Sequence, residues 1–143
     1  MSDVTGPLGL HVGQRARRTK TVTARDVELY AEITGDRNPL HFDPDFAART
    51  RFGRLVAQGG ITAGMLNTLV AMDLPGPGTV FMSQALKYLA PAYLGDTLTA
   101  EVEVLGLKPD KPVCQLRATI VNQDGTVLLE GDCWTYTLRP DGR

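Results

Sequence analysis

The sequence has little of several residues that would point to a particular protein class. Its 143 residues include two cysteines, two histidines and one tryptophan. The cysteines have no CxxC spacing and no histidine at metal-ligand spacing, which argues against a zinc site. Lysine and arginine (15) nearly balance aspartate and glutamate (16). Bulk charge therefore predicts neither a nucleic-acid nor an anionic-membrane partner.

Long apolar runs are also missing. Residues 1–10 lack the basic and apolar regions of a signal peptide, and no stretch is long enough to span a bilayer. We therefore expect a cytoplasmic protein with no membrane segment. Cys114 and Cys133 fall within predicted strands, where they could be buried free thiols or a disulfide. Free thiols are favoured because cysteine packs well as a small apolar side chain.

The length and composition are those of one globular domain. Apolar residues make up 43% and charged residues 22%, which is ordinary for a chain that buries a core. We expect a single domain over residues 1–143, with loose order in residues 1–12 and 139–143.

The first half of the chain predicts helices. A polar edge strand over residues 15–22 is followed by Thr23 and Asp26, which have the spacing of a capping box. Gly35 is a typical helix stop. After a loop, Asp43 precedes a proline, a pattern that favours the start of a second, short helix.

A third helix follows Gly59-Gly60 and is the most apolar segment of the chain. Its broad apolar stripe over residues 61–70 predicts a buried helix. The Pro-Gly-Pro-Gly run at 75–78 ends it.

The second half predicts antiparallel strands. Apolar and polar residues alternate over residues 97–104 and 114–120, and a last strand is expected over 126–138. Turns are indicated at 109–112 and 123–125. A sheet that wraps around one buried helix satisfies this order, so the fold class is α+β.

One of the two histidines has a chemically suggestive setting. His41 lies in the run GDRNPLHFDP, where a turn fixed by proline brings it near Asp36. A carboxylate and an imidazole can form an acid/base pair at neutral pH. The alternative is a surface loop in which Asp36 caps a turn and His41 packs against Phe42. His11 has no such neighbours.

The wider sequence around this pair resembles MaoC-like hydratases and (R)-specific enoyl-CoA hydratases. The resemblance rests on YAEITGDRNPLHFDPDFAARTRFGRLVAQGG, residues 30–60, and on SQALKYLAPAYLGDTLTAEVEV, residues 83–104. It extends from near Val22 to the end of the chain. It implies a hot-dog fold, in which an antiparallel sheet wraps around a central apolar helix.

The resemblance also implies roles for individual residues. Asp36 and His41 match the catalytic pair, which holds a water, and Asn38 matches a residue that shapes the site. Gly59 matches the glycine whose backbone N–H binds the thioester carbonyl oxygen. That role agrees with the unpaired amides and positive dipole at a helix start. No metal site is implied.

Two positions depart from the family pattern. Gln58 stands where many relatives carry histidine, so it can donate a hydrogen bond to substrate but cannot titrate. Asn67 stands where some relatives carry a small hydroxyl residue. We expect Asn67 to be buried with polar partners, either orienting the loop or contacting substrate.

The implied activity is that of a hydro-lyase, an (R)-specific enoyl-CoA hydratase that adds water reversibly to trans-2-enoyl thioesters. One alternative is a dehydratase for carrier-protein-bound or unusual 3-hydroxyacyl chains. Another is a non-catalytic acyl-thioester-binding module. A thioesterase is disfavoured because hot-dog thioesterases place a carboxylate in the central helix, and residues 61–72 contain none.

The expected partners follow from this activity. Coenzyme A or phosphopantetheine would arrive as part of the substrate, without a metal or redox cofactor. A homodimer with a continuous sheet would cover the exposed strand edge. Arg49, Arg51 and Lys87 are candidates for the phosphates of the carrier, with a solvated surface as the alternative.

Overall fold

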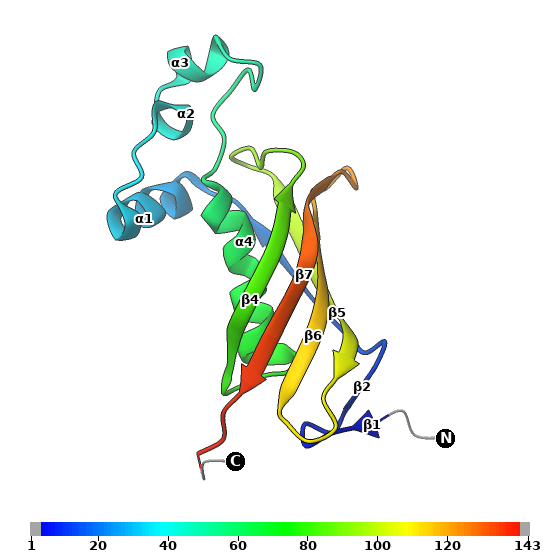
Figure 1. Ribbon diagram of the computed structural model, residues 1–143. Coiled ribbons are helices and arrows are strands. Elements are labelled where there is room, and N and C mark those ends of the chain that lie inside the picture. The colour runs from blue at the N-terminus through cyan, green and yellow to red at the C-terminus, as the bar shows by residue number, and fades with distance from the viewer. Residues whose placement is uncertain (1–3, 141–143) are drawn as a thin grey trace.

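The computed structural model describes residues 4–140. Five antiparallel strands form one sheet in the order β3-β5-β6-β7-β4, and helix α4 lies against it (Figure 1). This confirms the predicted α+β arrangement. The elements are β1 (Val4–Thr5), β2 (Leu10–His11), β3 (Arg15–Thr21), α1 (Ala24–Thr34), α2 (Pro39–Phe42), α3 (Pro44–Ala48), α4 (Gly59–Thr68), η1 (Leu69–Asp73), β4 (Thr79–Tyr88), β5 (Thr97–Leu107), β6 (Val113–Val121) and β7 (Val127–Thr137).

Helix α1 begins and ends where its capping residues predict. The Thr23 hydroxyl accepts from the Asp26 N–H at 3.1 Å, and the Asp26 carboxylate accepts from the Thr23 N–H at 2.9 Å. At the other end Gly35 takes a left-handed conformation, with φ of 83°, and donates its N–H to Ala31. Both ends are therefore set by local hydrogen bonds.

The segment after α1 contains one more helical turn than the sequence predicts. Asn38 accepts a hydrogen bond from the Leu40 N–H at 3.0 Å, and Pro39 occupies the first helical position of α2. Asp43 then caps α3, as predicted, by accepting from two backbone amides. Short side-chain caps thus hold α2 and α3 in place.

The core lies between α4 and the inner face of the sheet. Leu66 of α4 and Leu69 of η1 are completely buried, as are Leu98 and Leu116 of the facing strands. Their positions confirm that the apolar helix is buried and that alternate residues of the strands face inward. The helix continues through the π-helical turn η1 before residues 75–78 end it.

Both cysteines are buried and free, which confirms the favoured interpretation. Burial raises the pKa of Cys114 to about 12 and that of Cys133 to about 11, the latter helped by Asp132. Both side chains are thus unreactive packing groups at neutral pH.

The three helices that precede α4 gather at one end of the molecule. Helices α1, α2 and α3 lie beyond one end of the sheet, near the start of α4 (Figure 1). At the N-terminus, where loose order is expected, β1 and β2 pair with each other in a small separate sheet. No helix in residues 4–140 is long and apolar enough to cross a membrane.

Candidate active site

The loop between α1 and α2 places Asp36 through a chain of local hydrogen bonds. The Asp36 carboxylate accepts from the Asn38 N–H at 3.2 Å, and the Asn38 side chain accepts from the Leu40 N–H. Each step is a two-residue turn that an Asp or Asn side chain favours. Asp36 therefore caps a turn, as the surface-loop alternative requires, yet its second oxygen stays free. Asn38 thus shapes this loop, and its contact with substrate stays a prediction.

His41 is buried on α2, and its orientation is set from outside the loop. Its Nδ1 lies 2.7 Å from the carbonyl oxygen of Val56. A carbonyl can only accept, so Nδ1 carries the hydrogen and Nε2 presents its lone pair in the neutral ring. The Val56 N–H in turn donates to the Leu40 carbonyl at 3.1 Å, which ties the two segments together.

The other ring nitrogen faces the carboxylate. The Nε2 of His41 and the Oδ2 of Asp36 are 3.7 Å apart. This separation is too long for a direct hydrogen bond but suits one water bound to both atoms. The pair thus has the geometry to hold and deprotonate a water.

A cavity of about 300 Å³ opens beside His41. The imidazole, Gly59 at the start of α4, the buried hydroxyl residue Thr62 and the ring of Tyr88 form part of its wall. Most of the rest is aliphatic, from segments 56–57 and 89–92. The cavity therefore combines an apolar surface with a few polar groups, the usual character of a small-molecule site.

Two tyrosines pack against the first turn of α4. A Cβ atom placed on Gly59 would lie 3.0 Å from ring carbon Cε1 of Tyr88, and one placed on Gly60 would overlap the hydroxyl of Tyr30. Tyr88 is the last residue of β4, and Figure 1 shows that this end of the strand lies near the start of α4. The amides of this turn have no acceptor inside the helix and carry partial positive charge. Gly59 thus lies on the cavity wall with no side chain of its own, and its N–H makes no backbone hydrogen bond within residues 4–140.

Comparisons with known proteins agree with this geometry. The family model described as MaoC like domain matches residues 9–127. The chain belongs to the MaoC-like family. It is 41% identical over 123 residues to the (R)-specific enoyl-CoA hydratase of Aeromonas caviae, covering 86% of this chain and 92% of that protein. It is 43% identical over 119 residues to the 3-hydroxybutyryl-CoA dehydratase of Methylorubrum extorquens, covering 83% and 76%.

Solved MaoC-like structures confirm the hot-dog fold. The (R)-hydratase from A. caviae involved in PHA biosynthesis superposes with a TM-score of 0.86 at 39% identity, covering 90% of this chain and 97% of that one. The R-hydratase PhaJ1 from Pseudomonas aeruginosa superposes with a TM-score of 0.84 at 36% identity, covering 90% and 83%. The resemblance drawn from the sequence is thus confirmed.

Gln58 stands where the family pattern often has histidine, and its side chain makes a hydrogen bond inside the fold. The Gln58 side chain is 1% exposed, and its Nε2 donates to the Val27 carbonyl at 3.1 Å. This bond joins the start of α4 to α1. The buried Oε1 of Gln58 makes no hydrogen bond with the described residues, and the side chain is outside the cavity wall. Its contact with substrate stays a prediction.

The burial expected for Asn67 is wrong. Its side chain is exposed. Met65, Leu66 and Leu69 form the buried face of the helix, so Asn67 lies on the opposite face, away from the sheet. Asn67 is also absent from the wall of the cavity beside His41. A role in binding substrate stays a prediction for this residue.

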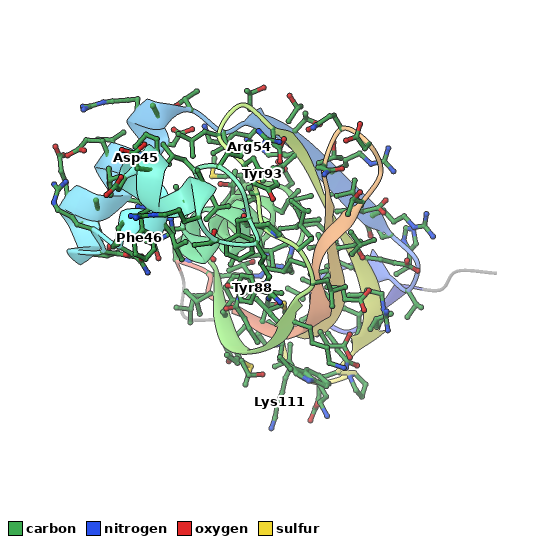
Figure 2. All side chains as sticks on the ribbon, turned by 90° about the horizontal axis from the view of Figure 1, so that it is seen from above. Asp45, Phe46, Arg54, Tyr88, Tyr93 and Lys111 are labelled. Carbon is green, nitrogen blue, oxygen red and sulfur yellow. The ribbon has the colours of Figure 1, made fainter. Side chains whose placement is uncertain are left out.

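The three basic residues predicted to bind the carrier phosphates differ in their distance from the cavity beside His41. Arg51 lines the cavity, whereas Arg49 and Lys87 do not. Arg54, which the sequence did not single out, stacks over the ring of Tyr93 at 3.9 Å from its centroid, and Figure 2 shows the two side by side. Among the three predicted arginine and lysine candidates, Arg51 alone meets the cavity.

Thr62 and Tyr88 were missed by reasoning from the sequence. A signal for Thr62 was present, since it is a polar residue three positions after Gly59 in an apolar helix. Tyr88 gave no signal, because only the packing of β4 against α4 brings its ring to Gly59.

Proposed function

We propose that this MaoC-like protein is an (R)-specific enoyl-CoA hydratase, which adds water to trans-2-enoyl thioesters to give (R)-3-hydroxyacyl thioesters. The observation that carries the proposal is the orientation of His41. Val56 holds Nδ1, so Nε2 faces Asp36 beside a cavity that begins at Gly59. The (R) stereochemistry follows the hydratase relatives in Aeromonas caviae and Rhodospirillum rubrum.

In the proposed reaction, the acid/base pair acts on one water. The water lies between Nε2 of His41 and Oδ2 of Asp36. His41 accepts a proton from the water as the water oxygen bonds to C3 of the substrate. Asp36 holds and orients the water. The pair then delivers a proton to C2, so that the elements of water are added across the double bond.

The thioester carbonyl makes this attack possible. As the oxygen bonds to C3, negative charge moves to the carbonyl oxygen, which binds the Gly59 N–H. The dipole of α4 stabilises that charge. Such a donor is worth about 10²–10³ in rate. The same groups would act in reverse during dehydration.

The substrate would bring its own carrier. Coenzyme A or phosphopantetheine is part of the thioester, and Arg51 at the cavity is placed to meet its phosphate. Hydration is redox-neutral and consists of C–O bond formation and proton transfers, so we propose that it needs no further cofactor. The buried free thiols Cys114 and Cys133 suit a reducing compartment, and we propose that the protein acts in the cytoplasm.

We further propose a homodimer joined along β4. This strand is at one edge of the sheet and exposes Val80 (52%) and Met82 (58%). The other edge, β3, carries mainly arginine and lysine, which oppose strand addition. Pairing of β4 with its copy would cover the apolar edge.

Two alternative functions are weighed against the proposed hydratase activity. A dehydratase for carrier-bound chains would use the same pair, and the mitochondrial 3-hydroxyacyl-[acyl-carrier-protein] dehydratase of Arabidopsis thaliana is 33% identical over 110 residues, covering 77% of this chain and 65% of that protein. A non-catalytic binding module has no need for a histidine held in one tautomer.

The deciding experiment is hydration of crotonyl-CoA and longer enoyl-CoAs, followed by loss of the enoyl thioester absorbance. We expect turnover, with a product oxidised by an (R)-specific but not by an (S)-specific 3-hydroxyacyl-CoA dehydrogenase. Folded protein that hydrates none of these thioesters would rule out the proposed function. Turnover of carrier-protein substrates alone would favour the dehydratase.

A further inference from the structure

Thr62 is a buried residue whose hydroxyl has no partner in the described part of the chain. Its side chain belongs to a residue that is 4% exposed and that lines the cavity together with His41 and Gly59. Thr34 and Thr50 donate their hydroxyls to backbone carbonyls at 2.8 Å. The Thr62 hydroxyl makes no such bond within residues 4–140. Among the described residues, the only side-chain polar atom that is both enclosed and unpaired is Oε1 of Gln58, so the Thr62 hydroxyl is open to the cavity that the residue lines. A group bound in the cavity can therefore accept a hydrogen bond from it.

The position of Thr62 on α4 indicates where that partner sits. It follows Gly59 by three residues, so both lie on one face of the helix. Side chains of a helix lean toward its N-terminus, so the Thr62 hydroxyl leans over the turn that Gly59 begins. Gly59 has no side chain to fill this space. The Thr62 hydroxyl and the Gly59 N–H therefore face the same part of the cavity.

We propose that Thr62 is a further catalytic residue, whose hydroxyl donates a second hydrogen bond to the thioester carbonyl oxygen beside the Gly59 N–H. This inference rests on the proposed hydratase function. Two donors hold the oxygen more firmly than one as it gains charge in the transition state. Thr62 thus contributes to the rate more than to ground-state binding.

A second possible acceptor for the Thr62 hydroxyl is the side chain of Gln58, the residue that caps α4. Gln58 precedes Thr62 by four residues, and its buried Oε1 has no hydrogen bond. If Thr62 donated to Gln58 during catalysis, removing the hydroxyl would lower the melting temperature and leave kcat unchanged. Measuring both quantities separates the two roles.

The test uses a matched pair of substitutions, Thr62→Val and Thr62→Ser, with crotonyl-CoA as substrate. Valine keeps the shape and removes the hydroxyl, whereas serine keeps the hydroxyl. We expect Thr62→Val to lower kcat by about 10²-fold with a much smaller change in KM, and Thr62→Ser to retain most of the activity. Thr68→Val is the control, because Thr68 lines a different hollow beside β3 and should leave kcat unchanged.

A spectroscopic readout tests the hydrogen bond without turnover. In a His41→Ala background, bound 2,4-hexadienoyl-CoA should absorb at longer wavelength because its carbonyl is polarised. Adding Thr62→Val should reduce this shift. Wild-type kcat and a full shift in the valine variants would overturn the role of Thr62 while leaving the hydratase function intact. A wild-type protein inactive on every enoyl thioester would overturn both.

Discussion

At the scale of single residues, the proposed chemistry depends on which ring nitrogen of His41 carries no hydrogen. The Val56 carbonyl takes the Nδ1 hydrogen at 2.7 Å, so the basic nitrogen points to Asp36. A carbonyl from a separate segment therefore decides the tautomer that the proton transfer needs. Asn38 supports this pair indirectly, because its N–H donates to the Asp36 carboxylate and so holds the loop.

Removing either member of the pair should stop catalysis without unfolding the protein. We expect Asp36→Asn and His41→Ala each to lower kcat for crotonyl-CoA by about 10²–10⁴. Asparagine keeps an oxygen to cap the turn at Asn38, so the loop should survive. Circular dichroism should match the wild type. Near-normal activity in either variant would remove that residue from the mechanism.

The two glycines at the start of α4 should respond differently to alanine. At Gly60 the added methyl group meets the Tyr30 side chain from its hydroxyl to its ring, whereas at Gly59 it meets only the edge of the half-exposed Tyr88 ring. We expect Gly60→Ala to destabilise the fold by about 1–3 kcal/mol, the usual cost of overpacking. Gly59→Ala should cost less stability.

Thermal unfolding compares the two glycine variants directly. Melting temperatures are the readout, because Gly60→Ala is expected to act on packing around Tyr30. A Gly59→Ala variant that melted lower than Gly60→Ala would contradict the packing seen around Tyr30.

At the scale of elements, the cap of α1 links the helix to the preceding strand. Asp26 accepts from the Thr23 N–H and pairs with Lys20 of β3 at 2.9 Å. Burial alone would raise the pKa of Asp26, but the hydrogen bonds from Thr23 and Lys20 outweigh it and lower that pKa below its ordinary value. The charged form is therefore favoured in the folded state.

This pKa has a predictable effect on stability. Since the folded state lowers the pKa, Asp26 stabilises the fold above the pKa of the unfolded chain, and this stabilisation is lost as pH falls through the folded pKa. Asp26→Asn should therefore melt below wild type at pH 7, with the gap closing in acid. Melting curves from pH 7 to pH 2 test this, and a constant gap would contradict it.

At the scale of the whole molecule, the two sheet edges differ in chemistry. Strand β3 presents the sequence RARRTKT, while β4 presents exposed Val80 and Met82. Charged edges resist pairing and apolar edges favour it. One edge is thus protected in the single chain, and the other is open to a partner.

Light scattering should therefore give twice the chain mass of 15.5 kDa at micromolar concentration. Val80→Lys places a charge on the β4 edge, and we expect it to shift the protein toward monomer. Leu138→Lys, at an equally exposed site outside β4 (59%), is the matched control and should stay dimeric. A monodisperse wild-type monomer would contradict the dimer.

Local sequence patterns predicted much of this protein. Thr23 and Gly35 bound α1 because caps depend on neighbours a few residues away. The alternation in β5 and the proximity of Asp36 and His41 are local for the same reason. The sequence by itself therefore determined α1, α3, the alternating strands and the buried character of α4, and it placed Asp36 close to His41.

Only the tertiary structure decided how these pieces act together. The Gln58 bond to Val27 spans 31 residues, and the His41 bond to Val56 spans 15. The exposure of Asn67 and the burial of Thr62 depend on how α4 is rotated against the sheet. Hydrogen bonds and packing between distant segments leave no periodic trace in the sequence. The tautomer of His41 and the hydroxyl in the cavity are therefore properties of the fold.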